Sequence, residues 1–206
     1  AGAYDEKFAA WARQAAAMKQ PFLLRIFHEM ELTDRNPWYS ADPQKFISLW
    51  RHVYDIFEAN GATNVIWVWS PAGQPQALDY YPGDDVVDYM GITVLGVPED
   101  PKSFRTLLNE KYYLSERLDK PLIIAELGFQ RVTPGENRQW MLDALNAIQD
   151  YANIRGVVLF NGPTPLYINP YGQPDYTLRP SELNIFDATI QGFDSTEVRV
   201  NQGESE

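Results

Sequence analysis

The sequence predicts an α/β protein in which a parallel sheet carries its helices on the outside. Five short apolar runs alternate with longer segments whose apolar residues recur every three or four positions. The runs show no polar alternation, which is typical of strands covered on both faces in a parallel sheet. Regular βαβα alternation of this kind indicates a parallel sheet with outer helices. With 206 residues, of which 45% are hydrophobic, one domain is the default expectation.

The chain begins with a predicted helix over residues 5–19, which Gln20-Pro21 ends. Its residues at helical spacing form one apolar face that we expect to be buried: Phe8, Trp11, Ala12, Ala15 and Met18. Residues 22–27 follow as a strand covered on both faces, and residues 30–41 form a polar, aromatic loop.

Asp42-Pro43 opens the second predicted helix, because Asp is a favoured N-cap and Pro suits the first turn. Asn60-Gly61 ends that helix. A covered strand over residues 64–69 comes next, and a long loop then leads to a short helical turn over residues 84–89.

The rest of the chain repeats the alternation, with expected strands over residues 90–95, 121–125 and 154–160 and expected helices over residues 101–118 and 134–152. After Asn161 the pattern loosens, and a short terminal helix is expected over residues 183–193. We therefore expect one domain over residues 1–194, followed by a polar acidic tail over residues 195–206.

Composition excludes several classes of function. The net charge of −11 disfavours nucleic acids and anionic membrane surfaces as partners. The chain has no cysteine, which removes disulfides, thiolate chemistry and Cys-ligated zinc. No apolar stretch approaches the 18 residues of a membrane span, and residues 1–5 have no signal-peptide character. The abundant tryptophan (6), tyrosine (12) and phenylalanine (10) suit either a core or platforms for sugar rings.

Two stretches of similar design each deliver a glutamate after an apolar run. Pro21-Phe-Leu-Leu-Arg-Ile-Phe-His-Glu29 is one, and Pro121-Leu-Ile-Ile-Ala-Glu126-Leu-Gly128 is the other. The carboxyl ends of barrel strands share one face, so the two side chains can meet although they are 126 − 29 = 97 residues apart. A glutamate at a strand end can equally be a loop-edge charge or a salt-bridge partner.

Six motifs follow one another along the chain. In order they are His28-Glu29-Met30 with Trp38-Tyr39, Trp50-Arg51-His52-Val53, Gly61 to Pro71, Tyr81-Pro82-Gly83-Asp84, Lys120 to Gly128 and Leu159-Phe160-Asn161. Together they make the chain, from about Gly2 to Ser181, similar to glycoside hydrolase family 26. This family comprises clan A (β/α)8 barrels and includes β-mannanases, mixed-linkage β-glucanases and β-1,3-xylanases.

The resemblance implies a (β/α)8 TIM-barrel type of fold that lacks its first three βα units, so the five strands correspond to strands four to eight. It implies Glu29 as the catalytic acid/base and Glu126 as the nucleophile. A retaining glycosidase needs two such carboxyls about 5–5.5 Å apart. No cofactor and no metal are expected.

The resemblance and the local chemistry add substrate-binding candidates, which are His28, Arg25, Trp38, Tyr39, Trp69, Asn161 and Tyr176. Arg25 is a candidate to orient or stabilise the nucleophile. His28 can also be a hydrogen-bonded core histidine, and Trp38, Tyr39 and Trp69 can be core residues. The other tryptophans, Trp11, Trp50, Trp67 and Trp140, are expected in the core.

The sequence departs from the family pattern at three places. Glu31-Leu32 stands where Asn-Gly is usual, and Thr93 and Leu95 replace the Asp and Tyr of a Gly-Ile-Asp-x-Tyr motif. Leu95 cannot donate the hydrogen bond that the family's tyrosine gives to the nucleophile. Tyr176 stands in the position of a stacking tryptophan. Losing one transition-state hydrogen bond costs roughly 10²–10³ in rate, which weakens an enzyme without abolishing it.

Two functional hypotheses follow. The first is a retaining endo-β-glycanase acting on a mannan or β-glucan-like polysaccharide. The second is a degenerate, non-hydrolysing module that binds a glycan or an assembly partner. Because a five-strand arc leaves unpaired edges, the missing barrel portion is expected from an upstream segment or a partner chain. We expect an extracytoplasmic or secreted bacterial protein with no membrane insertion.

Overall fold

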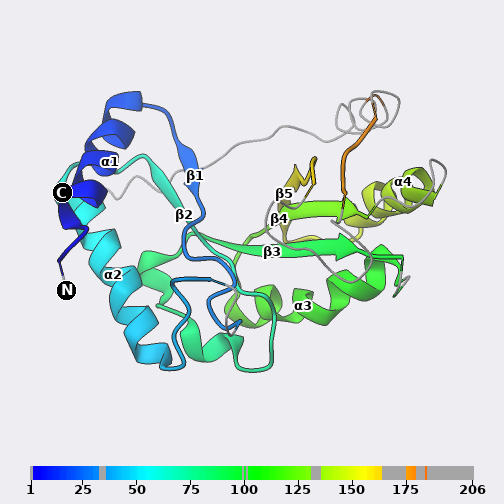
Figure 1. Ribbon diagram of the computed structural model, residues 1–206, viewed down its shortest axis with the longest axis horizontal. Coiled ribbons are helices and arrows are strands. Elements are labelled where there is room, and N and C mark those ends of the chain that lie inside the picture. Colours follow the sequence, from blue (N-terminus) through cyan, green and yellow to red (C-terminus); the bar gives the residue numbers. More distant parts are fainter. Residues whose placement is uncertain are drawn as a thin grey trace. The chain divides into compact units, whose positions relative to one another are not determined.

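The computed structural model describes residues 2–32, 36–98, 100, 102–130, 136–163, 175–179 and 184. They fall into two compact units, one up to Gly91 and one from Ile92 onward. The five strands follow one another in the order β1-β2-β3-β4-β5, so that neighbours in the chain are neighbours in the sheet (Figure 1). None of the described helices is long and apolar enough to cross a lipid bilayer.

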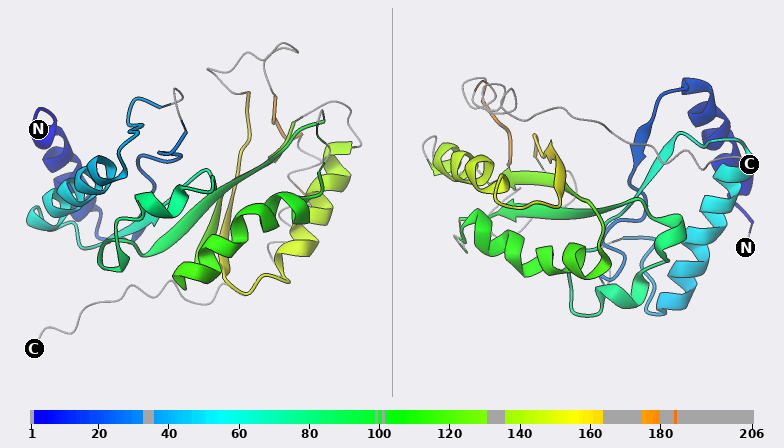
Figure 2. Two further views of the ribbon diagram at one scale, coloured as in Figure 1. Left: turned by 90° about the horizontal axis from the view of Figure 1, so that it is seen from below. Right: turned by 180° about the vertical axis from the view of Figure 1, so that it is seen from behind.

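The first unit alternates helix and strand in the predicted order. It contains α1 (Asp5–Met18), β1 (Phe22–Leu24), α2 (Pro43–Ala59), β2 (Val65–Trp69), two 3₁₀ turns, η1 (Ala77–Tyr80) and η2 (Asp84–Val86), and the start of β3 (Tyr89–Gly96). β1 pairs with β2 and β2 pairs with β3, both in parallel. The views in Figure 2 agree with Figure 1 that α1 and α2 lie side by side.

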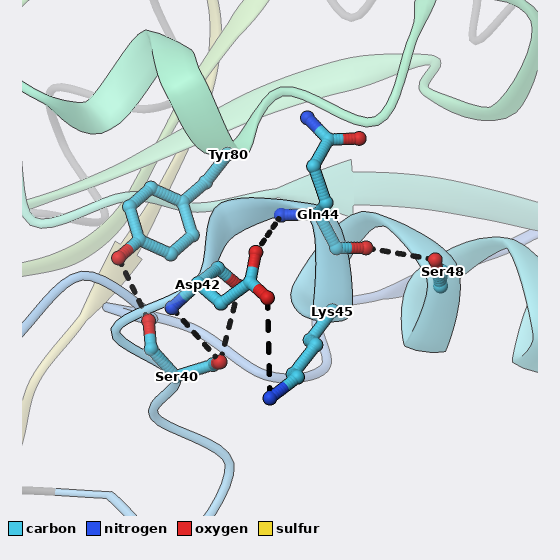
Figure 3. A network of polar contacts seen from close by, with 6 residues as sticks. All are labelled: Ser40, Asp42, Gln44, Lys45, Ser48 and Tyr80. Carbon is cyan, nitrogen blue, oxygen red and sulfur yellow. Dashed lines mark hydrogen bonds and ion pairs between the residues drawn. The ribbon is translucent and has the colours of Figure 1, made fainter.

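α2 starts where its cap predicts. The Asp42 carboxylate accepts a hydrogen bond of 3.1 Å from the backbone N–H of Gln44, and Pro43 occupies the first turn (Figure 3). The Ser40 hydroxyl accepts from the Asp42 backbone N–H at 3.2 Å, and the Tyr80 hydroxyl donates to the Ser40 carbonyl at 2.7 Å. These bonds tie the end of the preceding aromatic loop to η1 as well as to the helix.

An aromatic cluster forms the centre of the first unit's core. The Trp67 ring lies 5.7 Å from the ring of Trp50, 5.2 Å from that of Phe57 and 5.2 Å from that of Tyr54, measured between centroids. Trp50 and Trp67 are buried, as predicted, and the Trp50 indole N–H donates to the Val86 carbonyl at 3.1 Å. A buried indole with a satisfied N–H gives this core both apolar area and a fixed orientation.

The edge of the first unit is more exposed than predicted. In α1 only Ala12 and Ala15 of the expected apolar face are buried, whereas Trp11 is 56% exposed and Met18 58% exposed. β1 is also not covered on both faces, because Leu23 is 47% exposed. α1 packs on α2, and among the described strands β1 pairs with β2 alone, which leaves one edge of β1 without a neighbouring strand. The prediction that Trp11 belongs to the core is therefore wrong.

The second unit holds the rest of β3 with α3 (Phe104–Leu118), β4 (Leu122–Phe129), α4 (Glu136–Ile148) and β5 (Ile154–Leu159). β4 and β5 pair in parallel, and α4 packs against both α3 and β4. Ser103 caps α3, since its hydroxyl accepts a 3.2 Å hydrogen bond from the Thr106 backbone N–H. Trp140 is half-buried between the Phe104 and Phe129 rings.

Element lengths differ from prediction at both glutamates. β1 ends at Leu24, so Glu29 lies in a turn beyond the strand rather than at its end. β4 continues to Phe129, so Glu126 lies within the strand. The tail over residues 195–206 lies outside the described residues, as does the expected helix over residues 183–193 apart from residue 184.

Candidate active site

Glu29 lies in a tight turn that is anchored to the end of β2. Phe27 and Glu29 both adopt positive φ, 51° and 53°, in the left-handed region that side-chain-bearing residues rarely occupy. The Glu29 backbone N–H donates a 2.8 Å hydrogen bond to the carbonyl of Ser70, the residue directly after β2. Glu29 is half-buried. Backbone strain of this kind persists where surrounding contacts enforce it, and it gathers at functional sites.

Ser70 also positions Arg25. The Arg25 Nε donates a 2.9 Å hydrogen bond to the Ser70 hydroxyl, and Ser70 is fully buried. One residue after β2 therefore holds both the turn that carries Glu29 and the guanidinium that precedes it. Arg25 and Glu29 thus lie on the same short segment, with the Arg25 side chain and the Glu29 backbone both bonded to Ser70.

Trp38 belongs to the same site because it is attached to the residue before Glu29. Its indole N–H donates a 2.8 Å hydrogen bond to the His28 carbonyl, and the Asn36 amide donates to the same oxygen at 3.3 Å. The Trp38 and His28 rings lie 5.2 Å apart in a tilted arrangement. Trp38, Tyr39 and His28 are all half-buried, so part of each ring faces solvent.

Glu31 is a residue whose role sequence reasoning missed. It is only 3% exposed, and its Oε1 accepts hydrogen bonds from the backbone N–H groups of Gly73 at 3.0 Å and Gln74 at 3.4 Å. Its second oxygen, Oε2, is buried without a hydrogen-bond partner among the described residues. The carboxylate thus ties the turn after Glu29 to the loop that follows β2.

Trp69 is enclosed within the first unit. It is fully buried, and its ring packs edge-on against Tyr81 with 5.2 Å between centroids. Its indole N–H has no acceptor among the residues that the structure describes. This burial favours the core role over direct contact with a ligand.

Glu126, in the second unit, lies in β4 two residues before Gly128, where the pairing of β4 with β5 is irregular between Ile124 and Leu127. A Cβ atom at Gly128 would come within 3.1 Å of the Tyr176 ring and within 3.2 Å of the Leu95 side chain. The glycine therefore lets both side chains approach the strand beside Glu126. Tyr176, the tyrosine expected to stack on a sugar ring, thus lies next to β4, the strand that carries Glu126.

Asn161 holds the segment that carries Tyr176. Its side-chain carbonyl accepts a 2.9 Å hydrogen bond from the Leu178 backbone N–H, and the Tyr176 N–H donates to the Gly162 carbonyl at 3.1 Å. The Tyr176 ring then packs at right angles on Phe160, with 5.3 Å between centroids. Asn161 thus positions Tyr176, a task that the motif Leu-Phe-Asn does not reveal by itself.

The substitutions at Thr93 and Leu95 leave β3 well packed. Thr93 is 8% exposed, and its carbonyl accepts a 2.7 Å hydrogen bond from the Lys111 ammonium of α3. Leu95 is half-buried and lies beside Gly128. Within the described residues, no cluster of three or more His, Asp or Glu side chains could hold a metal ion.

A match to a known protein family identifies the family of this chain. Residues 2–129 match the family model of glycosyl hydrolase family 26, more than half of the chain. The chain belongs to glycosyl hydrolase family 26. The matched residues include Glu29 in the first unit and Glu126 in the second.

Named relatives of this family-26 chain include polysaccharide hydrolases. It is 31% identical over 178 residues to Endoglucanase H of Acetivibrio thermocellus, covering 78% of this chain and 20% of that protein. It is 30% identical over 136 residues to the beta-1,3-xylanase TXYA of a Vibrio species, covering 63% of this chain and 28% of that protein. The chain thus spans less than a third of each relative's length.

Solved structures share the fold of this family-26 chain. A GH26 β-mannanase from Bacteroides ovatus superposes with a TM-score of 0.65 at 21% identity, covering 92% of this chain and 58% of the mannanase. A β-mannanase from a symbiotic protist of the termite Reticulitermes speratus gives 0.58 at 20% identity, covering 95% and 53%. The predicted fold class, a partial barrel of five parallel strands, is confirmed.

One motif within the family-26 match has a structural explanation. The Arg51 guanidinium makes two hydrogen bonds to the Asp85 carboxylate, at 2.6 and 2.8 Å, and donates from Nε to the Pro82 carbonyl at 2.9 Å. Gly83 has a φ of 117°, and a Cβ there would come within 2.5 Å of the Arg51 guanidinium. The motif residues therefore fix the loop between the two 3₁₀ turns.

Proposed function

We propose that this chain supplies the catalytic pair of a retaining endo-β-glycanase that acts on a mannan or β-glucan-like polysaccharide. The observation that carries the proposal is that the family-26 match over residues 2–129 includes both glutamates. Relatives named as an endoglucanase and a β-1,3-xylanase, together with β-mannanase structures of the same fold, support a β-linked glycan as the substrate class.

In this proposal Glu29 is the acid/base and Glu126 is the nucleophile. The acid/base must deliver a proton to the leaving oxygen and later take one from water, which needs a carboxyl fixed in direction. The anchoring of the Glu29 turn to Ser70 supports that role. Arg25, which Ser70 also holds, is proposed to orient or stabilise the nucleophile, and Tyr176 is proposed to stack on a sugar ring.

Trp38, Tyr39 and His28 are proposed to line the same binding site. Their half-exposed rings follow or precede Glu29 closely, and two hydrogen bonds to the His28 carbonyl keep the loop in place. Rigid aromatic surfaces of this kind present apolar area without a large entropic cost on binding. Asn161 is proposed to position Tyr176. Trp69 is proposed to contribute by its packing in the core of the first unit.

The working enzyme is proposed to complete its barrel with further βα units from an upstream segment or a partner chain. The support lies in the first unit, where β1 is an edge strand with Leu23 47% exposed, beside a helix with Trp11 56% exposed. Free edges and exposed apolar groups of this kind favour pairing with another strand. Action on a polysaccharide also favours an extracytoplasmic or secreted location, which we propose here.

Release of reducing sugar from mannan, lichenan and β-1,3-xylan, by the chain together with the segment or partner that completes its barrel, tests the proposal. We expect Glu126→Ala and Glu29→Ala to lose activity by several orders of magnitude, while the exposed Asp55→Ala keeps it. The anomer formed first, followed by NMR, should have the configuration of the substrate, as retaining chemistry requires. Unchanged activity in Glu126→Ala would remove it as the nucleophile.

A second candidate function is the non-hydrolysing module. It is favoured by Leu95, which leaves the strand beside Glu126 without the family's hydroxyl donor. Polysaccharide binding by the completed barrel without any release of sugar, equal in the parent and in Glu126→Ala, would support the module and overturn the enzyme.

A further inference from the structure

A hollow with aromatic walls lies in the second unit, beside the starts of β4 and β5. Its volume is about 510 Å³, within the range typical of ligand sites. Its lining comes from α3 and from the loop between α4 and β5, and includes Asn109, Tyr112, Tyr113, Glu116, Asp150 and Tyr151. None of these residues is among the candidate catalytic or substrate-binding residues described above.

The hollow is at the end of the strands opposite to their carboxyl ends. The Asn153 backbone N–H donates to the Tyr112 hydroxyl at 3.2 Å, and the Asn153 carbonyl accepts from Leu122, the first residue of β4, at 2.8 Å. Glu126 lies further along the same strand. A ligand in this hollow would therefore lie beside the first residue of β4 and not at the segment that carries the candidate nucleophile.

Two of the tyrosines are held rigidly. The Tyr112 and Tyr151 rings pack at 73° with 4.8 Å between centroids, and the Tyr151 hydroxyl donates to the Asn109 side-chain carbonyl at 2.8 Å. Arg105 pairs with Asp150 and lies 5.9 Å above the Tyr151 ring. A wall fixed in this way needs little ordering when a ligand binds, which favours affinity.

The third tyrosine is available to a ligand. Tyr113 is 40% exposed, and no hydrogen bond or ring contact ties its side chain to another described residue. Asn109, Tyr113 and Glu116 follow one another at four and three positions along α3, so they share one face of the helix. At about 1.5 Å per residue this line is roughly 10 Å long.

The polar groups on this line suit hydroxyls better than charges. The Glu116 carboxylate can accept hydrogen bonds and the Asn109 amide N–H can donate them, one on each side of the Tyr113 ring. The lining residues include no cation that could pair with an anionic glycan, and the nearby Arg105 is already paired with Asp150. The net charge of −11 also opposes anionic ligands.

We propose that this hollow binds a neutral polysaccharide chain at a site separate from the part of β4 that carries Glu126. Tyr113 stacks on a sugar ring, while Glu116 and Asn109 bond its hydroxyls. The site would hold polymer at the surface of the protein, whether or not the chain hydrolyses it.

Electrophoresis through gels that contain soluble galactomannan or mixed-linkage β-glucan tests the proposal. All variants carry Glu126→Gln, which prevents hydrolysis of the gel polymer during the run. We expect Tyr113→Ala to raise the apparent Kd for the retarding polymer about tenfold relative to the parent. Tyr4→Ala is the matched control, because Tyr4 is an exposed tyrosine (63%) of the first unit, and it should be retarded like the parent.

Equal retardation of the parent and Tyr113→Ala would overturn the proposal, and so would absence of retardation by both polymers. Binding of choline through Tyr113 without retardation by polysaccharide would also overturn it, in favour of a cation site. Glu116→Ala gives a second measurement, with weaker retardation expected and the same thermal unfolding as the parent, because its side chain is exposed. Retardation that depends on Tyr113 in a chain that releases no reducing sugar would sustain this site while removing the proposed hydrolysis.

Discussion

The backbone N–H of Glu29 donates a 2.8 Å hydrogen bond to the carbonyl of Ser70, and this joins a strained turn to the end of β2. Glu29 has a φ of 53°, so the chain holds it in a conformation that glycine adopts more easily. The strain is local, but the bond that enforces it crosses 41 positions of sequence (70 − 29). The backbone conformation at Glu29 therefore depends on Ser70.

The first prediction concerns that backbone conformation. Glu29→Gly should be more stable than Glu29→Ala by about 1 kcal/mol, because the left-handed region costs a residue with a Cβ roughly that amount. Urea denaturation followed by tryptophan fluorescence measures the difference. Asp55, exposed within α2, is the matched control, and there the order should reverse, with Gly less stable than Ala by about 0.5–1 kcal/mol. Equal stability of the two Glu29 variants would contradict the strained turn.

The second prediction concerns the clamp that Glu31 makes. Glu31→Ala should lower the free energy of unfolding by about 1–3 kcal/mol, because it leaves the backbone N–H groups of Gly73 and Gln74 without their acceptor. Glu31→Gln keeps a side-chain carbonyl and should lose less. Denaturation by urea tests both variants against Glu58→Ala, an exposed glutamate of α2 that should change stability little. A Glu31→Ala protein as stable as the Glu58→Ala protein would be inconsistent with the clamp.

Local signals explain why most elements could be predicted from the sequence. Asp42 and Pro43 mark the start of α2 by cap chemistry that acts within one turn, and the structure has the helix beginning there. The apolar runs predict β2 and β4 within a few residues, because strands covered on both faces are nearly continuous in apolar side chains. The resemblance to the family then predicts that the sheet is part of a barrel, which periodicity alone cannot show.

The errors lie where burial or geometry depends on distant residues. Trp11 and Leu23 have the pattern of buried residues, but burial also requires a neighbour, and none of the described elements covers them. The turn at Glu29 depends on Ser70, which no local pattern around Glu29 signals. Glu31 stood out only as a departure from the family motif, since its partners at positions 73 and 74 belong to another loop.

The third prediction concerns Gly83. Its φ of 117° and ψ of 157° lie in a region that is open almost only to glycine. Gly83→Ala should cost about 1–3 kcal/mol, because the new methyl group would also come within 2.5 Å of Arg51 and 2.7 Å of Asp85. Gly61→Ala is the control: its φ is 76° but nothing lies within 4 Å of the added group. Thermal unfolding should show the larger loss for Gly83→Ala, and a reversed order would contradict the close approach of Arg51.

The last prediction concerns alkaline pH and Tyr81. Burial, followed by the 2.6 Å hydrogen bond that its hydroxyl donates to Asp84, raises the pKa of Tyr81 above its usual value of about 10. The folded protein therefore keeps the phenol proton at a pH where the unfolded chain loses it. The stability from this group is fully present below about pH 10 and is lost as the pH rises above that value.

Tyr81→Phe removes the hydrogen bond to Asp84, so this variant should be less stable than the parent at pH 7. Its free energy of unfolding should fall less steeply than that of the parent between about pH 10 and 11. Asp84→Asn keeps the burial and loses the charge, so its slope should lie between the other two. Urea denaturation at a series of pH values measures all three, and parallel curves for the parent and Tyr81→Phe would show that Tyr81 does not carry the effect.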